Sequence, residues 1–206
     1  MFLKQMIKFN KNKKTRERGF TLVELMVATT VFVLIVVSSI GSLLTLLGAS
    51  KDSRALRFAM DNVNFAMESM TRSIRMGVNY YCVNEVDGTT PSDVNSIQNC
   101  SSGGTLVSFV PQSSIADGSP YRVTYKLSSR GDSTHTLKRC IGNNESNCVE
   151  IISSDIDIKQ LKFFVNGASS IDSVQASVYI TLKGEITVKG KVSSFMLQTL
   201  ASQRNF

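Results

Sequence analysis

The longest apolar run in the sequence extends from Phe20 to Leu47, and its only ionisable side chain is Glu24. As a helix this run would be about 42 Å long, more than the roughly 30 Å hydrocarbon core of a membrane requires. Its Thr and Ser residues are compatible with such a helix, because their hydroxyls can bond to carbonyls one turn earlier. The run therefore predicts a transmembrane helix over residues 20–47.

Apolar positions continue beyond this run with helical spacing, at intervals of four and three residues. The stripe that they form consists of Leu56, Met60, Val63, Met67, Met70 and Ile74. Most charged residues of the same stretch fall on other faces, which predicts an amphipathic continuation of the helix over residues 48–77. The stripe could form a short coiled coil, but packing on a sheet of the same chain is favoured. Gly77 is a natural end for the helix.

After Gly77 the pattern changes to short runs of β-branched and aromatic residues. Strands are predicted at Thr105–Val110, Tyr121–Leu127, Thr136–Ile141, Ile158–Val165, Val174–Leu182 and Lys191–Ala201. Residues 84–104 are rich in Asn, Ser, Thr, Asp and Gly and predict an irregular insertion. No helix-length pattern separates the strands, so an antiparallel sheet is expected. The predicted fold class is α+β, with a long N-terminal helix packed on the antiparallel sheet of a domain over residues 78–206.

The positive charge of the chain is concentrated at its N-terminus. Residues 1–19 contain seven basic residues and one acidic residue, a balance of +6, whereas the other 187 residues contain 16 basic and 15 acidic residues. The nearly neutral body does not favour nucleic acid as a partner. Basic residues before a membrane helix stay in the cytoplasm, so the domain that follows is expected on the outer side of the membrane.

All four cysteines lie in the C-terminal two-thirds of the chain, at Cys82, Cys100, Cys140 and Cys148. An even number confined to one region predicts disulfides in an oxidising compartment, which agrees with the topology from the charges. Of the three possible pairings, Cys82 with Cys100 and Cys140 with Cys148 is preferred because each closes a short loop. Free buried thiols are the alternative. A zinc site is disfavoured, since there is no C-x-x-C and the only histidine is His135.

Glu24 is the feature that a simple membrane anchor does not explain. A secretory signal peptide has an apolar core of only about 7–15 residues, so an uncleaved signal anchor is the simpler alternative. A carboxylate one turn into a membrane helix costs several kcal/mol unless it is paired or lies at the interface. The nearest conceivable positive partner is the α-amino group that a cut immediately before Phe20 would create.

The residues Arg18-Gly19-Phe20-Thr21-Leu22-Val23-Glu24-Leu25-Met26-Val27-Ala28 resemble the N-terminal signal of type IV prepilins and pseudopilins. The resemblance implies that a prepilin peptidase cuts between Gly19 and Phe20 on the cytoplasmic side and N-methylates Phe20. It also implies that Glu24 neutralises the terminal amine of a neighbouring subunit, because two buried charges that are costly alone are tolerable together. The implied partners are the peptidase/methyltransferase, other pilin or pseudopilin subunits, an inner-membrane assembly platform and the lipid bilayer. No cofactor is implied.

Two details bear on the subtype. Major pilins often have proline about where Gly41 falls, and glycine there indicates either local softness of the helix or close helix packing. The C-terminal stretch Gln198–Asn205 is similar to the tail of J-type minor pseudopilins and related minor pilins. The leader of residues 1–19 is longer than in many members of the family.

The sequence contains no convincing catalytic constellation. His135 lies in a Ser/Thr-rich stretch, and Asp155 and Asp157 alone are a weak signal for calcium. The leading hypothesis is a structural subunit, a minor pilin or pseudopilin of a type IV pilus or a type II secretion filament. The alternative is an uncleaved single-pass anchor that displays an adhesive or binding domain, and a third possibility places such a domain at a filament tip. The sequence does not distinguish pilus, secretion and competence systems.

Overall fold

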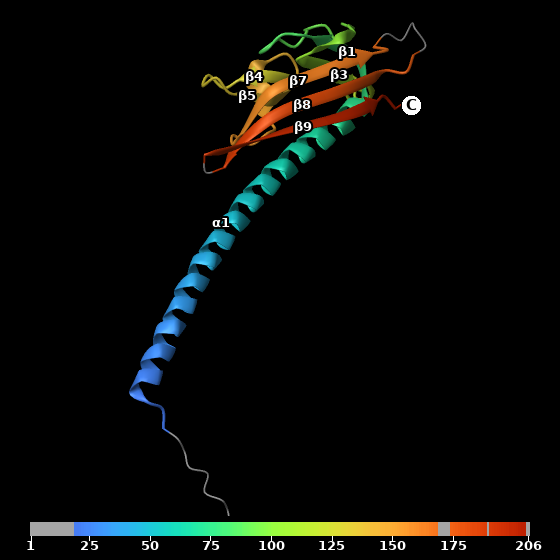
Figure 1. Cartoon of the computed structure of the whole chain (residues 1–206). Helices are drawn as coiled ribbons and strands as arrows, with labels where there is room; N and C mark the ends of the chain where they lie inside the picture. Colours follow the sequence, from blue (N-terminus) through green and yellow to red (C-terminus); the bar gives the residue numbers. More distant parts are fainter. Residues whose placement is uncertain (1–18, 169–173, 189, 205–206) are drawn as a thin grey trace, which may run out of the picture. The chain divides into compact units, whose positions relative to one another are not determined.

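The computed structural model describes residues 19–168, 174–188 and 190–204 (Figure 1). The chain divides into two compact units, residues 1–49 and 50–206. Except for Gly19, the leader predicted over residues 1–19 lies outside the described residues.

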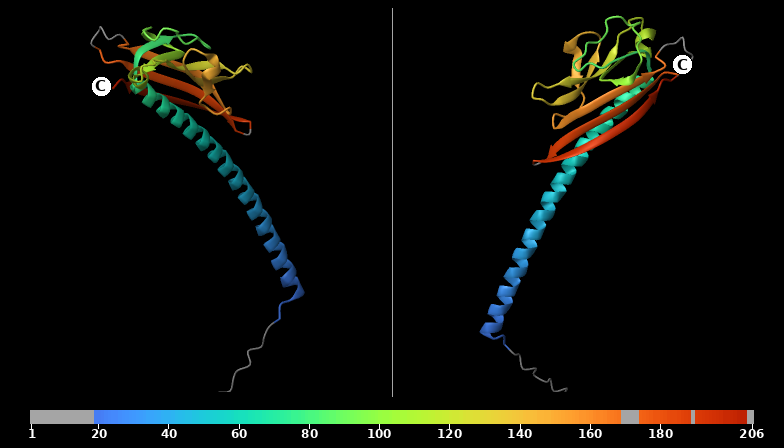
Figure 2. Two further views of the ribbon diagram at one scale, coloured as in Figure 1. Left: turned by 180° about the vertical axis from the view of Figure 1, so that it is seen from behind. Right: turned by 45° about the horizontal axis from the view of Figure 1, so that its top comes forward.

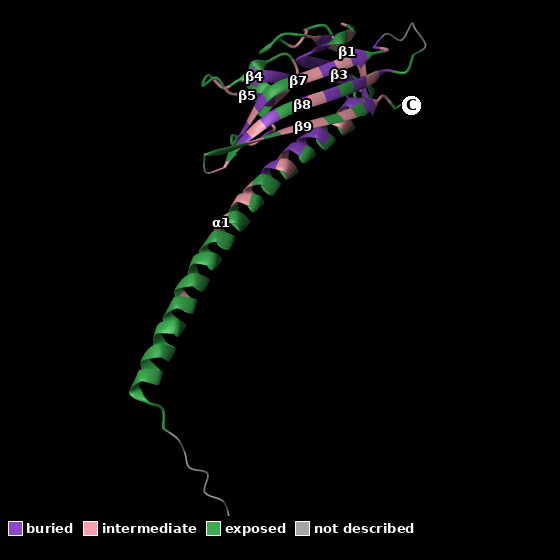
Figure 3. Cartoon of the chain, viewed as in Figure 1, coloured by how far each residue is buried: buried purple, intermediate pink, exposed green. Residues whose placement is uncertain are grey.

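Helix α1 extends from Leu22 to Arg75 and contributes to both units (Figure 1). This confirms the prediction of one long helix that continues beyond the apolar run. In the first unit nearly every helical residue is exposed, because the apolar side chains have no packing partner within this unit (Figure 3). Gly41, which could have softened the helix, lies inside it without interrupting it.

In the second unit one face of α1 is buried in the core (Figure 3). The buried residues are Ala59, Val63, Ala66, Met67, Met70 and Ile74. The predicted stripe is therefore confirmed from Val63 to Ile74, whereas Leu56 remains 37% exposed. The stripe belongs to the same apolar cluster as the inner side chains of the strands, as expected for packing on a sheet of the same chain.

Helix α1 ends through contacts that the sequence does not reveal. The buried Tyr80 hydroxyl shares its hydrogen bond between the carbonyls of Ile74 and Gly77, at 2.8 and 2.7 Å. The Ile74 carbonyl is one of the groups that a helix end leaves unpaired. Gly77 begins strand β1 rather than capping the helix. A Cβ atom at Gly77 would lie 2.4 Å from Cδ2 of Phe109, so the close approach of that ring requires glycine.

The strands form two antiparallel sheets rather than one (Figures 1 and 2). The five-stranded sheet has the order β1-β3-β4-β5-β6, and the four-stranded sheet has the order β2-β7-β8-β9. The strands are β1 (Gly77–Val83), β2 (Cys100–Gly104), β3 (Leu106–Pro111), β4 (Val123–Ser129), β5 (His135–Ile141), β6 (Cys148–Glu150), β7 (Ile156–Asn166), β8 (Ser177–Val188) and β9 (Lys191–Ser202). Two short helices, α2 (Gln112–Ala116) and the 3₁₀ helix η1 (Glu145–Asn147), complete the described elements. The α+β prediction is confirmed.

All six predicted strands are present, and three further strands were not predicted. Strand β2 replaces the last part of the insertion that was expected to be irregular throughout residues 84–104. The remaining part, residues 84–99, is irregular apart from an isolated bridge between Tyr81 and Gln98.

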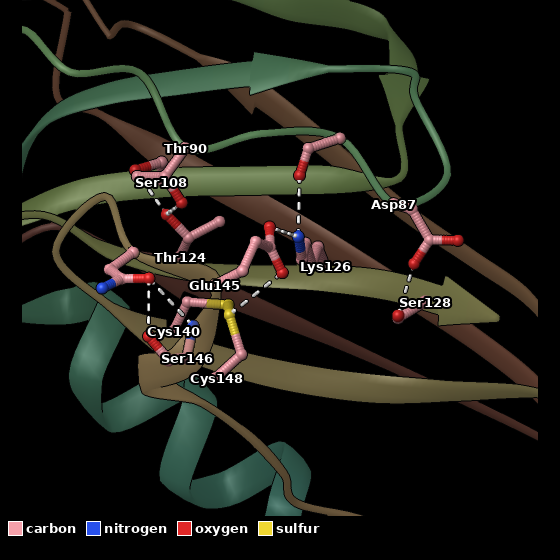
Figure 4. The surroundings of a disulfide bond; sticks show 12 residues. Asp87, Thr90, Ser108, Thr124, Lys126, Ser128, Cys140, Glu145, Ser146 and Cys148 are labelled. Atoms are coloured by element: carbon pink, nitrogen blue, oxygen red, sulfur yellow. Dashed lines mark hydrogen bonds and ion pairs between the residues drawn. A yellow bond between two sulfur atoms is a disulfide. The ribbon is translucent and has the colours of Figure 1, made fainter. Parts of the chain in front are cut away.

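Strand β4 is buried on both faces. Its apolar face, with Val123, Tyr125 and Leu127, joins the core. Its other face is polar, and there the Lys126 ammonium donates to the carbonyl of Gly88 at 3.0 Å and to the Glu145 carboxylate (Figure 4). Residues of the 84–99 segment and of η1 therefore cover this polar face.

Both disulfides of the structure join cysteines that are close in sequence. Cys82 bonds to Cys100. Cys140 bonds to Cys148, and Figure 4 shows this second bond. These are the pairs that the sequence analysis preferred over the other connectivities. The first closes the 84–99 segment at its base, and the second joins directly opposite residues of β5 and β6.

Candidate functional site

The candidate processing site lies in non-helical chain immediately before α1. Gly19 and Phe20 are both exposed, and the Phe20 side chain is 81% exposed. The helix begins two residues later, at Leu22. A Cβ atom at Gly19 would meet no atom within 4 Å. The described part of the chain therefore gives no steric reason for glycine at position 19.

Thr21 caps the first turn of α1. Its backbone carbonyl accepts from the N–H of Leu25 at 3.2 Å, and its Oγ1 accepts from the N–H of Glu24 at 3.2 Å. This is half of a capping box, in which a Thr at the N-cap is followed three residues later by Glu. The sequence analysis did not identify this role, although the Thr21-x-x-Glu24 spacing is the usual signal for it.

The Glu24 carboxylate lies in the first helical turn and, among the described residues, has no hydrogen-bond or ion-pair partner. The positive end of the helix dipole offers it a partial local stabilisation, typically about 0.3–1 kcal/mol at an exposed site. That is less than the several kcal/mol that a carboxylate costs in a membrane helix. Since none of the described residues pairs with it, the Glu24 carboxylate is available for a positive group beyond them.

The rest of the N-terminal half of α1 offers an almost wholly apolar surface. Five hydroxyls bond to carbonyls of the same helix at 2.7–3.0 Å: those of Thr29, Thr30, Ser38, Ser39 and Thr45. They add little polarity to the surface, since each donor is satisfied within the helix. In the part of the chain that the structure describes, α1 is the one helix long and apolar enough to cross a membrane.

The residues considered for metal binding are engaged or dispersed. Asp157 pairs with Lys159 and accepts from the backbone N–H of His135 at 2.9 Å. Burial acts to raise the pKa of Asp157, but these two interactions outweigh it and hold the pKa below its usual value. Asp155 precedes β7 and is exposed, so the two carboxylates do not share one strand. No group of three or more His, Cys, Asp or Glu residues gathers as a metal site in the described ranges.

A comparison with protein families identifies the N-terminal segment. The family model described as "Prokaryotic N-terminal methylation motif" matches residues 14–40, which include Gly19, Phe20 and Glu24. No curated protein and no solved structure matches the chain. The motif is that of a structural rather than a catalytic family, and the long apolar helix that begins within the matched residues agrees with a membrane-anchored precursor.

Proposed function

We propose that this chain, which carries a type IV prepilin-type methylation signal, is a minor pilin or pseudopilin of a type IV pilus or a type II secretion filament. A prepilin peptidase would cut between Gly19 and Phe20 and methylate the new N-terminus. The observation that carries the proposal is Glu24, a carboxylate without a partner among the described residues, in the first turn of α1 and five positions after Gly19; it is the only ionisable side chain of the apolar run from Phe20 to Leu47.

The assembly step follows from the cost of isolated charges in a membrane. After the cut, the Phe20 amine of one subunit and the Glu24 carboxylate of a neighbour are each expensive in hydrocarbon. Bringing them together removes much of that cost, so subunits associate at a defined register along α1. Thr21 supports this by fixing the first turn on which Glu24 stands. Other subunits and an inner-membrane assembly platform are the proposed partners.

The proposed parts are a leader at 1–19, a membrane and assembly helix at 20–47, its amphipathic continuation at 48–77 and an extracytoplasmic domain at 78–206. Two observations support placing the leader in the cytoplasm and the domain at 78–206 on the outer side of the membrane. The two disulfides favour an oxidising compartment for the second unit, and the leader carries a balance of +6, which favours the cytoplasm. The likeness of Gln198–Asn205 to minor subunits favours a minor role, although Asn205 lies outside the described residues.

Processing is tested with Gly19→Ala in cells that contain the peptidase. The wild-type chain is expected to yield a mature mass that begins at methylated Phe20, and the variant is expected to keep the precursor mass. Because a Cβ atom at Gly19 meets nothing, a change in folding does not confound the result. A wild-type mass that still includes the leader would favour the uncleaved membrane anchor with an adhesive or binding domain.

Assembly is tested with Glu24→Gln and Thr21→Ala. Glu24→Gln removes the charge, and we expect normal cleavage but little incorporation into filaments. Thr21→Ala removes the cap but keeps the charge, so it controls for a weakened first turn, worth about 1 kcal/mol. Normal incorporation of Glu24→Gln would refute the pairing mechanism.

A further inference from the structure

Strand β9 is an open edge of the four-stranded sheet (Figure 1). It pairs with β8 over its whole length without a bulge, and in the described structure no strand pairs with its other side. The N–H of Gln203 donates to the carbonyl of Ala176 at 2.8 Å, which continues this ladder by one pair. Since hydrogen-bonded pairs alternate along an antiparallel ladder, the even-numbered residues from Val192 to Ser202 direct their N–H and C=O groups to the free side.

The free edge of β9 lacks the features that normally protect an edge strand. Natural edge strands are short, are interrupted by bulges, or contain charged residues or proline. Residues 192–202 contain neither a charged residue nor proline. The other described edges are β1, β2 and β6, with 7, 5 and 3 residues, whereas β9 has 12. Among the described edges, β9 is therefore the one best suited to pair with a further strand.

Three apolar side chains on the outer face of β9 are exposed. Val192, Met196 and Leu200 are 61, 62 and 60% exposed. They are four positions apart, so they point to the same side of the sheet. A strand added to the free edge would place its own side chains opposite and diagonal to these three and would cover them. The edge and its outer face therefore favour an extended segment with apolar residues at alternate positions.

A groove lies between the free edge of β9 and α1. The consecutive residues Leu197, Gln198 and Thr199 line a hollow of about 300 Å³ together with residues of α1. Because neighbouring strand residues point to opposite faces, a hollow lined by all three lies at the edge of the sheet. Glu68 and Thr71 of α1 line both this hollow and a larger one of about 540 Å³. The two hollows therefore adjoin.

The larger hollow lies at the C-terminal end of β9 and is basic. Three arginines and one glutamate line it, Arg72, Arg75, Arg204 and Glu68, which gives an excess of two positive charges. Arg72 pairs with Glu68 at 2.7 Å. The backbone N–H of Arg204 donates to the carbonyl of Arg75 at 2.9 Å, which keeps these two arginines together. A carboxylate is the group that complements such a pair of guanidinium groups.

We propose that the free edge of β9 binds an extended segment of another protein as a fifth, antiparallel strand. An antiparallel strand begins where β9 ends, so an acidic residue immediately before the added strand enters the hollow lined by Arg75 and Arg204. Backbone hydrogen bonds supply affinity, and the apolar and acidic side chains supply specificity. The inference goes beyond the proposed function and depends neither on cleavage at Gly19 nor on the pairing of Glu24.

A second copy of β9 does not fit the free edge. Two β9 strands in an antiparallel pair would bring Lys191 of each copy toward Arg204 of the other. Residues 186–206 contain three basic residues and no acidic one. Pairing between copies would therefore place like charges together, which is unfavourable across strands. A segment that begins with an acidic residue has the opposite charge at the position where β9 requires it.

The binding experiment uses a fluorescent synthetic peptide with the sequence of β8, preceded by two aspartates. The sequence of β8 is chosen because its side chains already match those of β9 over the whole strand. The full-length chain in detergent micelles is expected to bind this peptide saturably, as measured by fluorescence anisotropy. Absence of saturable binding would overturn the inference. A chain that dimerises and thereby loses the peptide would assign the edge to a second copy, which would also overturn it.

Backbone pairing is tested with Ser194→Pro. This change removes one N–H on the free side of β9, where proline is compatible with an edge strand. Ser194→Ala keeps the N–H and is the matched control. We expect at least a several-fold higher dissociation constant for Ser194→Pro and no change for Ser194→Ala. Urea unfolding of both variants checks that the domain is intact, and equal binding of the two variants would contradict strand addition.

Methylation of the peptide tests the same bonds without any change in the protein. Peptide residues directly opposite the even-numbered residues of β9 would exchange hydrogen bonds with them, whereas the intervening peptide residues point away. N-methylation of the first set is therefore expected to abolish binding, and N-methylation of the second set should leave it unchanged. Equal effects of the two modifications would overturn the inference.

The basic hollow is tested with the double variant Arg75→Gln/Arg204→Gln. We expect it to bind the peptide several-fold more weakly, and to make no difference when the two aspartates are replaced by asparagines or moved to the C-terminus of the peptide. Arg139→Gln on β5 is the control and should bind like the wild type. Equal losses with all three peptides would show that the two arginines do not receive the aspartates, which would contradict the proposed orientation.

Discussion

Arg122 is the buried residue on which the order of the 84–99 segment most directly depends. It is only 1% exposed, yet its guanidinium donates to three carbonyls of that segment, those of Asp93, Val94 and Ser96, at 3.1–3.2 Å. Burial lowers the pKa of Arg122 to about 10, which still leaves it charged at neutral pH. The charge is compatible with burial because backbone carbonyls surround it.

We expect Arg122→Met to lower the free energy of unfolding by roughly 3 kcal/mol, because it leaves several buried carbonyls without a donor. Urea unfolding of the full chain in detergent micelles measures the change. Arg139→Met on neighbouring β5 is the matched control; Arg139 is partly exposed and has no hydrogen bond or ion pair in the described structure. Equal effects of the two variants would show that the carbonyl contacts contribute little.

Asp157 gives the chain a pH-dependent contribution to stability. Its pKa is held below the usual value by Lys159 and the backbone N–H of His135, although burial opposes this. A carboxyl whose pKa is lower in the folded state stabilises the fold above about pH 4, and this contribution is lost as the pH falls through the folded pKa. Asp157→Asn should therefore cost about 1 kcal/mol at pH 7 and much less at pH 3. Asp155→Asn, an exposed neighbour, should show no such difference in urea unfolding at the two pH values.

The roles of some single residues could be predicted from the sequence, and those of others could not. Glu24 could be identified because a carboxylate in an apolar run is conspicuous in the sequence alone. Gly77 was interpreted as a helix stop, but the reason for glycine is the Phe109 ring, which lies 32 positions away in the sequence. Arg122 resembles any strand residue until the 84–99 segment is seen to cover it. Contacts between distant residues decide these roles, and periodicity carries no information about them.

At the scale of elements, prediction succeeded where an element satisfies a local pattern. Helix α1 was predicted because it has both an apolar run and an apolar stripe, and β7 and β8 because they are runs of β-branched and aromatic residues. Strand β2, with the sequence CSSGG, has no strand propensity and depends on pairing with β7 and on the Cys82–Cys100 bond. Strand β6 has only three residues and is joined to β5 by Cys140–Cys148.

The two disulfides are expected to differ in their effect on stability. They link cysteines 18 and 8 positions apart. Loop-closure entropy then gives about 3 kcal/mol for Cys82–Cys100 and about 2.5 kcal/mol for Cys140–Cys148. Replacing each pair by alanine and measuring urea unfolding tests the order, with the wild-type chain as the control.

The rate of proteolysis within the 84–99 segment should also differ between the two disulfide variants. Only loss of Cys82–Cys100 removes the closure at the base of this segment, so that variant is expected to be cut there by a protease at a low dose. If the protease cuts the 84–99 segment equally fast in the Cys140/Cys148 variant, the Cys82–Cys100 bond is not what protects this segment.

At the scale of the whole molecule, the proposed topology links the charge of the leader to the disulfides of the second unit. The leader carries a balance of +6 and the rest of the chain +1, so cleavage after Gly19 would remove nearly all the net charge of +7. Before cleavage the same charge would orient the helix, and the cysteines would then reach an oxidising compartment. With the proposed topology, the oxidation state of the four cysteines would report on which side of the membrane the second unit lies.

Changing Lys11, Lys13 and Lys14 to Glu would reduce the balance of residues 1–19 from +6 to 0, because three basic residues become acidic. In a host without the peptidase, so that only orientation is measured, a larger fraction of chains is expected to keep the second unit in the cytoplasm with reduced cysteines. Alkylation of free thiols followed by gel electrophoresis measures that fraction. Changing the same lysines to Arg keeps the charge and should leave the cysteines oxidised. Equal oxidation in both variants would mean that the apolar helix, rather than the leader charge, sets the orientation of the chain.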